Sequence, residues 1–329
     1  MDNSTKTVVI IVNFNGKEFL DRCLESLQCQ VFRNFKTVVV DNFSRDGSVE
    51  GIEERFSGVE IIRLEKNIGF AAANNYAIKR AEGFQWVALL NPDAIAEPDW
   101  LSNLHMAAEK NSQYNFFGSH LKKQGSLNQL DGTGDVYHLC GLAWRRDHGM
   151  PEKQTSRLVE EIFSPCAAAA MYRRDIVLDV DGFDERFFCY FEDIDLSFRL
   201  RLLGHRCLYV PNAKVEHFGS AIAGRRSDFA VYHGHRNMVW AYVKNMPSRL
   251  FWRGLPQHIL ANLAALIWFS LTGQAGPIFK AKRDALLGLR KTIEQRKSIQ
   301  KKTKVSSKNL KKIIATDWLL PYLKNRELM

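Results

Sequence analysis

The first hundred residues alternate between short apolar runs, which are typical of strands, and longer segments with apolar residues at helical spacing. The apolar runs predict strands at 7–13, 35–41, 59–64 and 86–91. Helical patterns lie between them, at 17–29, from Ser48 onward and at 69–81. A strand–helix order repeated in this way favours a mostly parallel sheet with helices on both faces. The chain is therefore expected to be an α/β protein.

Polar side chains follow each predicted strand at its carboxyl end: Asn13 and Asn15, Asp41 and Asn42, Lys66 and Asn67, and Asn91 and Asp93. Ligands of parallel α/β sheets bind beyond these ends, so the residues are candidates for a binding site. Asp41 could accept a hydrogen bond from the imide N–H of uracil or thymine, but an Asp at a strand end is as often a turn cap. Asp93 could coordinate a divalent cation that bridges two phosphates, but Asn91-Pro-Asp93 could equally be a turn.

A second acidic site lies in the segment Phe187-Phe-Cys-Tyr-Phe-Glu-Asp-Ile-Asp-Leu-Ser-Phe-Arg199, where three carboxylates stand among five aromatic rings. Ionised carboxylates beside apolar surface are costly unless they are paired or coordinated. Helix capping is a sufficient explanation for Asp195. It does not explain the pair Glu192 and Asp193, one of which could accept a proton from an attacking hydroxyl.

Further candidates lie at the end of the last strand-like segment and just beyond it. His217 closes it, and a lone His is more often a surface or core residue than a ligand. A neutral imidazole near Asp93 could nonetheless complete a metal site that tolerates Mn²⁺. Arg225 and Arg226 could bind a diphosphate through their guanidinium forks, although adjacent arginines are more often surface charge.

The middle third of the chain is less regular. Turn-forming residues at 124–134 and 151–156 predict loops. A small-residue apolar run at 166–172 favours a strand, and 207–211 predicts a short one. A helix is expected at 195–203.

The positive charge of the chain lies almost entirely in its last quarter. The net charge is +10, but from Met246 onward 17 Lys and Arg residues face 4 Asp and Glu residues, a balance of +13. An apolar, Trp-bearing segment at 250–278 precedes a basic one, Arg290 to Lys312. This combination favours an anionic membrane surface as partner over nucleic acid. The most apolar stretch, 259–271, is expected to be too short to span a bilayer.

Cysteine use and the N-terminus both point to the cytosol. The six cysteines contain no Cys-x-x-Cys pair, which argues against a zinc knuckle or a redox dithiol and fits reduced thiols. The N-terminus carries no basic segment followed by an apolar one, so no signal peptide is predicted. The expected location is therefore the cytoplasm, peripheral on the inner face of the cell membrane.

Taken together, the polar motifs resemble those of the family 2 glycosyltransferases, which have the GT-A nucleotide-sugar-binding fold. The matching pieces stand in the family's order and cover about residues 7–245: Val12-Asn-Phe-Asn15, Val39-Val-Asp-Asn-Phe-Ser-Arg-Asp-Gly-Ser48, Asn67-Ile-Gly-Phe-Ala-Ala-Ala-Asn-Asn75, Leu90-Asn-Pro-Asp93, Gly182-Phe-Asp-Glu185, Phe191-Glu-Asp-Ile-Asp-Leu-Ser-Phe-Arg199 and His217-Phe-Gly-Ser220. Within the family the chain is most similar to bacterial rhamnosyltransferases of cell-wall and O-antigen assembly. The resemblance implies a GT-A catalytic domain at 1–245. The charge and apolar pattern of 246–329 predict a basic amphipathic helical extension that associates with the membrane or lies on the acceptor side.

The resemblance also implies an inverting transfer from a nucleotide sugar to a lipid-linked or polysaccharide acceptor, with Mg²⁺ or Mn²⁺ as cofactor. By analogy Asp41 recognises the base, and Asn13, Asn15, Asn67 and Asn91 surround the nucleotide. Asp93 matches the last acid of the family's Asp-x-Asp metal motif, whose first position is here Asn91. That departure removes a negative charge and increases the weight of His217 as a ligand. Asp193 matches the catalytic base of the family's Glu-Asp motif, with Glu192 beside it.

Other functions are not excluded by these motifs alone. The preferred donor is dTDP-L-rhamnose, and a UDP-hexose is the alternative. A nucleotidyltransferase would share the sheet and the metal but not the Glu-Asp pair. A nucleic-acid-binding protein would use the basic tail, but residues 1–245 carry a balance of −3. A dinucleotide-dependent oxidoreductase needs a Gly-rich loop after the first strand, where this chain has Asn13-Phe-Asn-Gly16.

Overall fold

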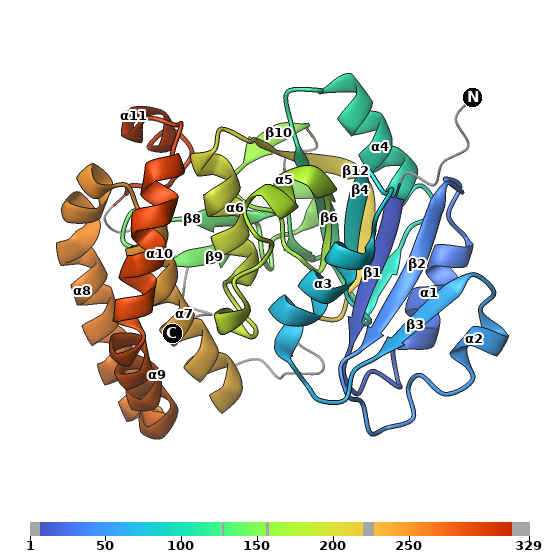
Figure 1. The fold of residues 1–329 in the computed structure, drawn as a ribbon, viewed down its shortest axis with the longest axis horizontal. Coiled ribbons are helices and arrows are strands. Elements are labelled where there is room, and N and C mark those ends of the chain that lie inside the picture. Colours follow the sequence, from blue (N-terminus) through green and yellow to red (C-terminus); the bar gives the residue numbers. More distant parts are fainter. Residues whose placement is uncertain (1–6, 127, 156–157, 220–226, 318–329) are drawn as a thin grey trace.

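The computed structural model describes residues 7–126, 128–155, 158–219 and 227–317, which are built around a ten-stranded sheet (Figure 1). Along the main path the strand order is β10-β12-β6-β11-β4-β1-β2-β3, with β5 paired to β12 and β7 to β6. These strands are β1 (Thr7–Asn13), β2 (Phe35–Asp41), β3 (Val59–Arg63), β4 (Trp86–Leu90), β5 (Ala94–Ala96), β6 (Phe116–Lys123), β7 (Leu130–Gly132), β10 (Glu160–Ile162), β11 (Ala169–Arg173) and β12 (Cys207–His217). Strands β8 (Asp135–Tyr137) and β9 (Ala143–Arg145) form a separate antiparallel pair.

Helices cover both faces of the sheet and one end of the molecule (Figure 1). They are α1 (Leu20–Gln28), α2 (Ile52–Arg55), α3 (Gly69–Arg80), α4 (Trp100–Lys110), α5 (Arg174–Asp179), α6 (Glu192–Leu202), α7 (Asp228–Asn245), α8 (Ser248–Leu271), α9 (Ala275–Leu287), α10 (Leu289–Lys302) and α11 (Ser307–Leu310), with short 3₁₀ turns at Glu152–Gln154 and Glu185–Phe187. One apolar core joins α1 and α4 to the sheet. A second core on the other face joins α3, α5 and α6.

The predicted mostly parallel α/β fold is confirmed. Strands β1 to β4 are parallel, because helical crossovers between consecutive strands return the chain to the same edge of the sheet. The register aligns their carboxyl ends: Asn13 lies opposite Asp41, and Asp41 lies opposite Arg63. Polar residues that are distant in sequence therefore meet along one edge.

Several predicted boundaries differ from the structure. The small-residue strand is β11, and it runs antiparallel to both β4 and β6. The strand predicted to be short, β12, continues to His217 because it pairs with β6 and then with β5. The predicted loop at 124–134 contains β7, which pairs with the end of β6. Pairing partners far away in the sequence decide each of these cases, so local composition did not reveal them.

The C-terminal helices are packed on the end of the molecule that carries α6 and α7. Helix α7 contacts α9 and α10, and α8 contacts α9. An apolar cluster that includes Phe198 of α6, Met246 and Leu310 joins this layer to the α/β body. The apolar stretch 259–271, expected to be too short to span a bilayer, belongs to a longer helix, because α8 begins at Ser248. The expectation was therefore wrong as to length. Within the described residues, α8 alone is long and apolar enough to cross a membrane.

Candidate active site

Strand pairing brings the two predicted metal ligands together. Asp93 directly precedes β5, and the antiparallel pairing of β5 with β12 places Ala94 opposite His217. The Oδ1 atom of Asp93 lies 3.4 Å from Nε2 of His217, and both side chains are buried. The side-chain amide of Asn91 also lies 3.4 Å from that nitrogen. A carboxylate and an imidazole at this spacing are a suitable start for a Mn²⁺ or Mg²⁺ site.

His217 is oriented by a carboxylate that the sequence analysis missed. Its Nδ1 atom lies 2.8 Å from Oδ2 of Asp131, in the middle of β7. Burial alone would lower the pKa of His217, but its hydrogen bonds to Asp131 and Asp93 raise it to about 9. With Nδ1 bonded to Asp131, Nε2 points toward Asp93. A carboxylate partner commonly orients a metal-binding imidazole in this way, by bonding the ring nitrogen that does not bind the metal.

Arg145 connects this pair of residues to the second acidic site. Its Nη1 atom donates to Oδ2 of Asp131 at 2.6 Å, and its Nε lies 3.6 Å from Oδ1 of Asp135. Asp135 and Arg145 are cross-strand neighbours in the β8–β9 pair. A Cβ atom at Gly132 would lie 2.1 Å from Cγ of Arg145, so only glycine at this position leaves room for the arginine to reach Asp131.

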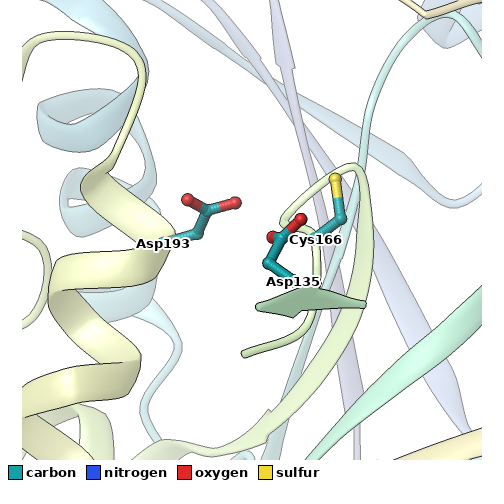
Figure 2. A group of neighbouring side chains, drawn as sticks. All are labelled: Asp135, Cys166 and Asp193. Carbon is teal, nitrogen blue, oxygen red and sulfur yellow. The ribbon is translucent and has the colours of Figure 1, made fainter. Parts of the chain in front are cut away.

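Asp193 lies at the far end of the same chain of contacts. Figure 2 shows it at the start of α6, facing Asp135 and Cys166, and one ligand atom of each lies within 4.8 Å of the others. Desolvation raises the pKa of Asp193, against hydrogen bonds from the amides of Ala167 and Ile194. Desolvation likewise raises the pKa of Asp135, to about 7, although Arg145 opposes the shift.

This second cluster is better suited to handling a proton than to binding a metal. Both carboxylates are desolvated, and burial raises the pKa of each, which favours protonation over the fully ionised pair. Burial also raises the pKa of the Cys166 thiol, and a thiol is not a ligand that Mg²⁺ or Mn²⁺ prefers. A carboxylate with a raised pKa is a stronger base than an exposed one, which suits the role of general base.

The backbone before Asp193 is strained, and α7 holds it in place. Three residues of this loop have positive φ values: 64° at Phe188, 68° at Tyr190 and 67° at Phe191. Residues other than glycine rarely adopt this backbone conformation. The Nδ2 atom of Asn237 on α7 lies within 2.7 to 2.9 Å of three carbonyl oxygens of this loop. Arg236 donates to two carbonyls of the same loop. Such strain persists only where surrounding contacts over-determine it, and it is concentrated at functional sites.

The other acids of the segment have separate roles. The sequence analysis explained Asp195 by helix capping, but Asp195 is not the cap of α6. It is buried and accepts from Arg199 at 2.8 Å and from Lys244 and Asn245 at 2.7 Å each. Glu192 is buried, and desolvation, together with the nearby charge of Asp193, raises its pKa well above the usual range. Of the pair, Asp193 is the residue suited to act as a base.

A polar group at the ends of β1 and β2 forms the remaining side of the site. Asn13 is buried and donates to Ser44 at 3.0 Å and to Ser48 at 2.8 Å. Asp41 is buried and accepts from the amide of Ser44 at 3.2 Å. These bonds hold the loop after β2 next to β1, and they leave Oδ1 of Asn13 buried without a partner.

The flanking asparagines support this loop edge. Asn67 accepts from Asn42 at 2.9 Å, and it also accepts from the amide of Gly69 at the start of α3. Asn15 is exposed, has a φ of 53° and accepts from the amide of Arg45. Asn15 is therefore the member of this group that a ligand can reach most directly.

The structure thus joins two of the predicted acidic sites through residues that were not predicted. Contacts run from Asp93 through His217, Asp131, Arg145 and Asp135 to Asp193. The sequence signal for the linking residues was two acids in a Gly-rich segment, Asp131-Gly-Thr-Gly-Asp135. Arg225 and Arg226 lie outside the described residues.

The sequence matches a known family and several related proteins. The model of the family described as Glycosyl transferase family 2 matches residues 8–180. An N-acetylglucosaminyl-diphospho-decaprenol L-rhamnosyltransferase of Mycobacterium tuberculosis is 27% identical over 248 residues, which cover 68% of this chain and 80% of the relative. The O-antigen biosynthesis protein RfbC of Myxococcus xanthus is 27% identical over 68% of this chain, but the match covers only 18% of that protein.

Solved structures show the same fold. S. aureus TarS 1–349, in complex with UDP-GlcNAc, has a TM-score of 0.57 and 18% identity over 90% of each chain. GalNAc-T7, solved with UDP, GalNAc and Mn²⁺, has a TM-score of 0.58 and 16% identity, covering 74% of this chain and 48% of its own. At these identities the likeness establishes a GT-A type fold and no more.

Proposed function

The chain belongs to the family 2 glycosyltransferases, and on that premise we propose that it catalyses an inverting sugar transfer from a nucleotide-diphosphate donor to a hydroxyl group. One observation carries the proposal. The contact chain between Asp93 and Asp193 gives one site two chemically different ends: a carboxylate–imidazole pair at one, and a carboxylate of raised pKa at the other. A single displacement at an anomeric carbon needs a phosphate-binding end and a basic end of this kind.

The reaction follows from the roles of these residues. The acceptor oxygen forms a bond to the anomeric carbon as the bond from that carbon to the diphosphate oxygen breaks. Asp193 takes the proton of the acceptor hydroxyl, which contributes roughly 10²–10⁴-fold to the rate. Desolvation raises the pKa of Asp193, and the positive charge of Arg145 opposes that shift. Asp135 lies beside Asp193. No covalent intermediate on the protein is needed, because inversion takes one step.

Asp93 and His217 would hold a divalent cation, Mg²⁺ or Mn²⁺. When bound, such an ion supplies positive charge to the departing diphosphate. The fit rests on the donor set: Oδ1 of Asp93 faces Nε2 of His217, and Asp131 fixes the ring by bonding its other nitrogen, Nδ1. The neighbours GalNAc-T7 and the mannosyltransferase PcManGT were both solved with Mn²⁺.

The nucleotide would bind along the ends of β1, β2 and β4. Asp41 would recognise the base, and Asn13, Asn15, Asn67 and Asn91 would line the nucleotide. The preferred donor is dTDP-L-rhamnose, since the mycobacterial relative is named an L-rhamnosyltransferase. A UDP-hexose is the second candidate, since TarS 1–349 was solved with UDP-GlcNAc.

The acceptor would be a lipid-linked or polysaccharide glycan at the cytoplasmic face of the cell membrane. The mycobacterial relative is named for a diphospho-decaprenol substrate. The residues that we assign to the site all lie within the proposed catalytic domain, 1–245. Residues 246–329 would form the part that contacts the anionic membrane surface. No role for nucleic acid is proposed.

A donor-hydrolysis and transfer screen tests the proposal. dTDP-, UDP- and GDP-sugars are incubated with the full chain, with Mg²⁺, with Mn²⁺ and with EDTA. Release of one nucleoside diphosphate above background, dependent on a divalent cation and lost in Asp193→Asn, supports it. Turnover by Asp193→Asn equal to that of the wild type would remove Asp193 from the role of base.

A further inference from the structure

Helix α8 presents an apolar face outward. Ile259, Leu263, Ile267 and Leu271 recur every four residues, and their exposed fractions are 50%, 49%, 62% and 80%. Residues four apart lie on one face of a helix, so these side chains form a continuous stripe. In Figure 1 α8 lies at the outer edge of the molecule, at the end opposite α2 and β3. No charged residue occurs between Pro256 and Leu271.

The inward face of the same helix is partly polar. Gln257 and His258 are buried, and Nδ1 of His258 lies 2.7 Å from the carbonyl oxygen of Cys140. Asn262 accepts from Nζ of Lys282 on α9 at 2.5 Å, and that nitrogen lies 3.3 Å from the carbonyl oxygen of His235 on α7. The same face also buries Ala261, Ala265 and Phe269. The departure from a helix on the surface of a water-soluble protein is therefore the apolar outward face, where polar residues are the rule.

The outward apolar surface continues beyond α8. Of the 18 large apolar side chains that are exposed among the described residues, 11 lie between Trp252 and Ile293. They include Trp268 on α8 and both Leu286 and Leu287 on α9. Isolated exposed apolar residues are normal on a soluble protein, but 11 of them on consecutive helices, four in one stripe of α8, indicate a surface that contacts something apolar.

Exposed basic residues lie on the same helices as this surface. Arg249 and Arg253 are exposed at the start of α8, and Lys280 and Arg283 are exposed on α9. Helix α10 adds further exposed lysines, and the acids of these three helices are Asp284 and Glu294 only. An apolar face with aromatic residues and a basic rim matches a bilayer whose headgroups are anionic.

We propose that the outward face of α8 and α9 is a membrane-docking surface that inserts into the headgroup and upper acyl region of an anionic bilayer. The helices lie along the membrane and do not cross it, because the inner face of α8 is held by its bonds to α9 and to Cys140. This inference deepens the membrane-facing part of the proposed function by naming the surface and its depth.

Vesicle flotation of the full chain tests it. The probe is a vesicle of phosphatidylcholine with phosphatidylglycerol, compared with phosphatidylcholine alone. The triple variant Ile259→Glu, Leu263→Glu, Ile267→Glu should lower the bound fraction at a fixed lipid concentration by at least about tenfold. All three side chains are exposed, so folding should be retained, and circular dichroism and the melting temperature check this.

A matched control carries three Glu substitutions at exposed apolar positions of the α/β body: Val31→Glu, Met106→Glu and Val159→Glu. It should float like the wild type. Donor hydrolysis in solution, which needs no membrane, should be unchanged in the α8 triple variant. Loss of flotation with hydrolysis retained supports the docking surface separately from the proposed function.

Two outcomes would overturn the inference. One is equal flotation of the α8 variant and the wild type. The other is a wild type that does not float but forms a dimer, seen by light scattering, that the α8 substitutions dissociate. That result would assign the surface to a second copy of the chain.

Discussion

The carboxylate of Asp131 supports both His217 and Arg145, and Asp131→Ala removes both contacts at once. The two hydrogen bonds, of 2.8 and 2.6 Å, are charge-assisted, and Asp131 is buried. Losing a carboxylate that orients a metal-binding imidazole typically lowers metal affinity about 10–100-fold. That corresponds to about 1.4–2.7 kcal/mol of binding free energy. The loss should be largest for Ala and smaller for Asn, which keeps an acceptor oxygen.

Mn²⁺ binding measured by electron paramagnetic resonance gives the affinity directly, without turnover. The free energy of unfolding, from urea titration, is measured in parallel. Arg145 keeps Asp135 as a partner, so the stability loss should fall at or below the lower end of the ~3–5 kcal/mol expected when a buried ion pair is broken. Asp175→Ala, at an exposed ion pair with Arg173, is the control and should change neither quantity. Wild-type Mn²⁺ affinity in a folded Asp131→Ala protein would refute the orienting role of Asp131.

Three further outcomes are expected. Asp193→Asn should lower transfer roughly 10²–10⁴-fold in a product assay and leave nucleotide affinity, measured by calorimetry, unchanged. Asp41→Ala should weaken binding of the nucleoside diphosphate in the same calorimeter, and unchanged affinity would remove it from base recognition. Lys244→Met removes the cation shared by the buried carboxylates of Asp184 and Asp195, 2.7 Å from each. Because Asp184 keeps Arg186 and Asp195 keeps Arg199, the free energy of unfolding should fall by an amount at or below the lower end of ~3–5 kcal/mol. Although desolvation opposes it, Lys244 and Arg186 hold the pKa of Asp184 below its usual range. Its stabilisation is therefore present above about pH 4 and lost as the pH falls further, so the acid limb of a stability–pH curve should be shallower in the variant.

The metal-side residues illustrate how far sequence reasoning reached. Asp93 and His217 were each ambiguous alone, since an Asn-Pro-Asp turn and a lone His both have ordinary explanations. The pairing of β5 with β12 makes them neighbours, and it depends on a strand longer than its local composition predicted. Asp131, Asp135 and Arg145 could not be chosen from sequence, because a Gly-rich segment with two acids reads as a loop until its pairing partners are known.

Periodicity and the motifs at strand ends determined the α/β class, the mostly parallel sheet and the family, because these depend on patterns that are local or repeat along the chain. They also determined the edge of the sheet at which we propose that the nucleotide binds. Helix α8 shows the opposite limit. Its sequence identifies an apolar helix, but which face is buried depends on where His258 and Asn262 find partners, on a loop and a helix elsewhere in the chain. Only tertiary packing decided that the face with Gln257 and His258 is buried while the stripe through Ile259, Leu263 and Ile267 is exposed. Only strand pairing decided that Arg145 connects the two ends of the site.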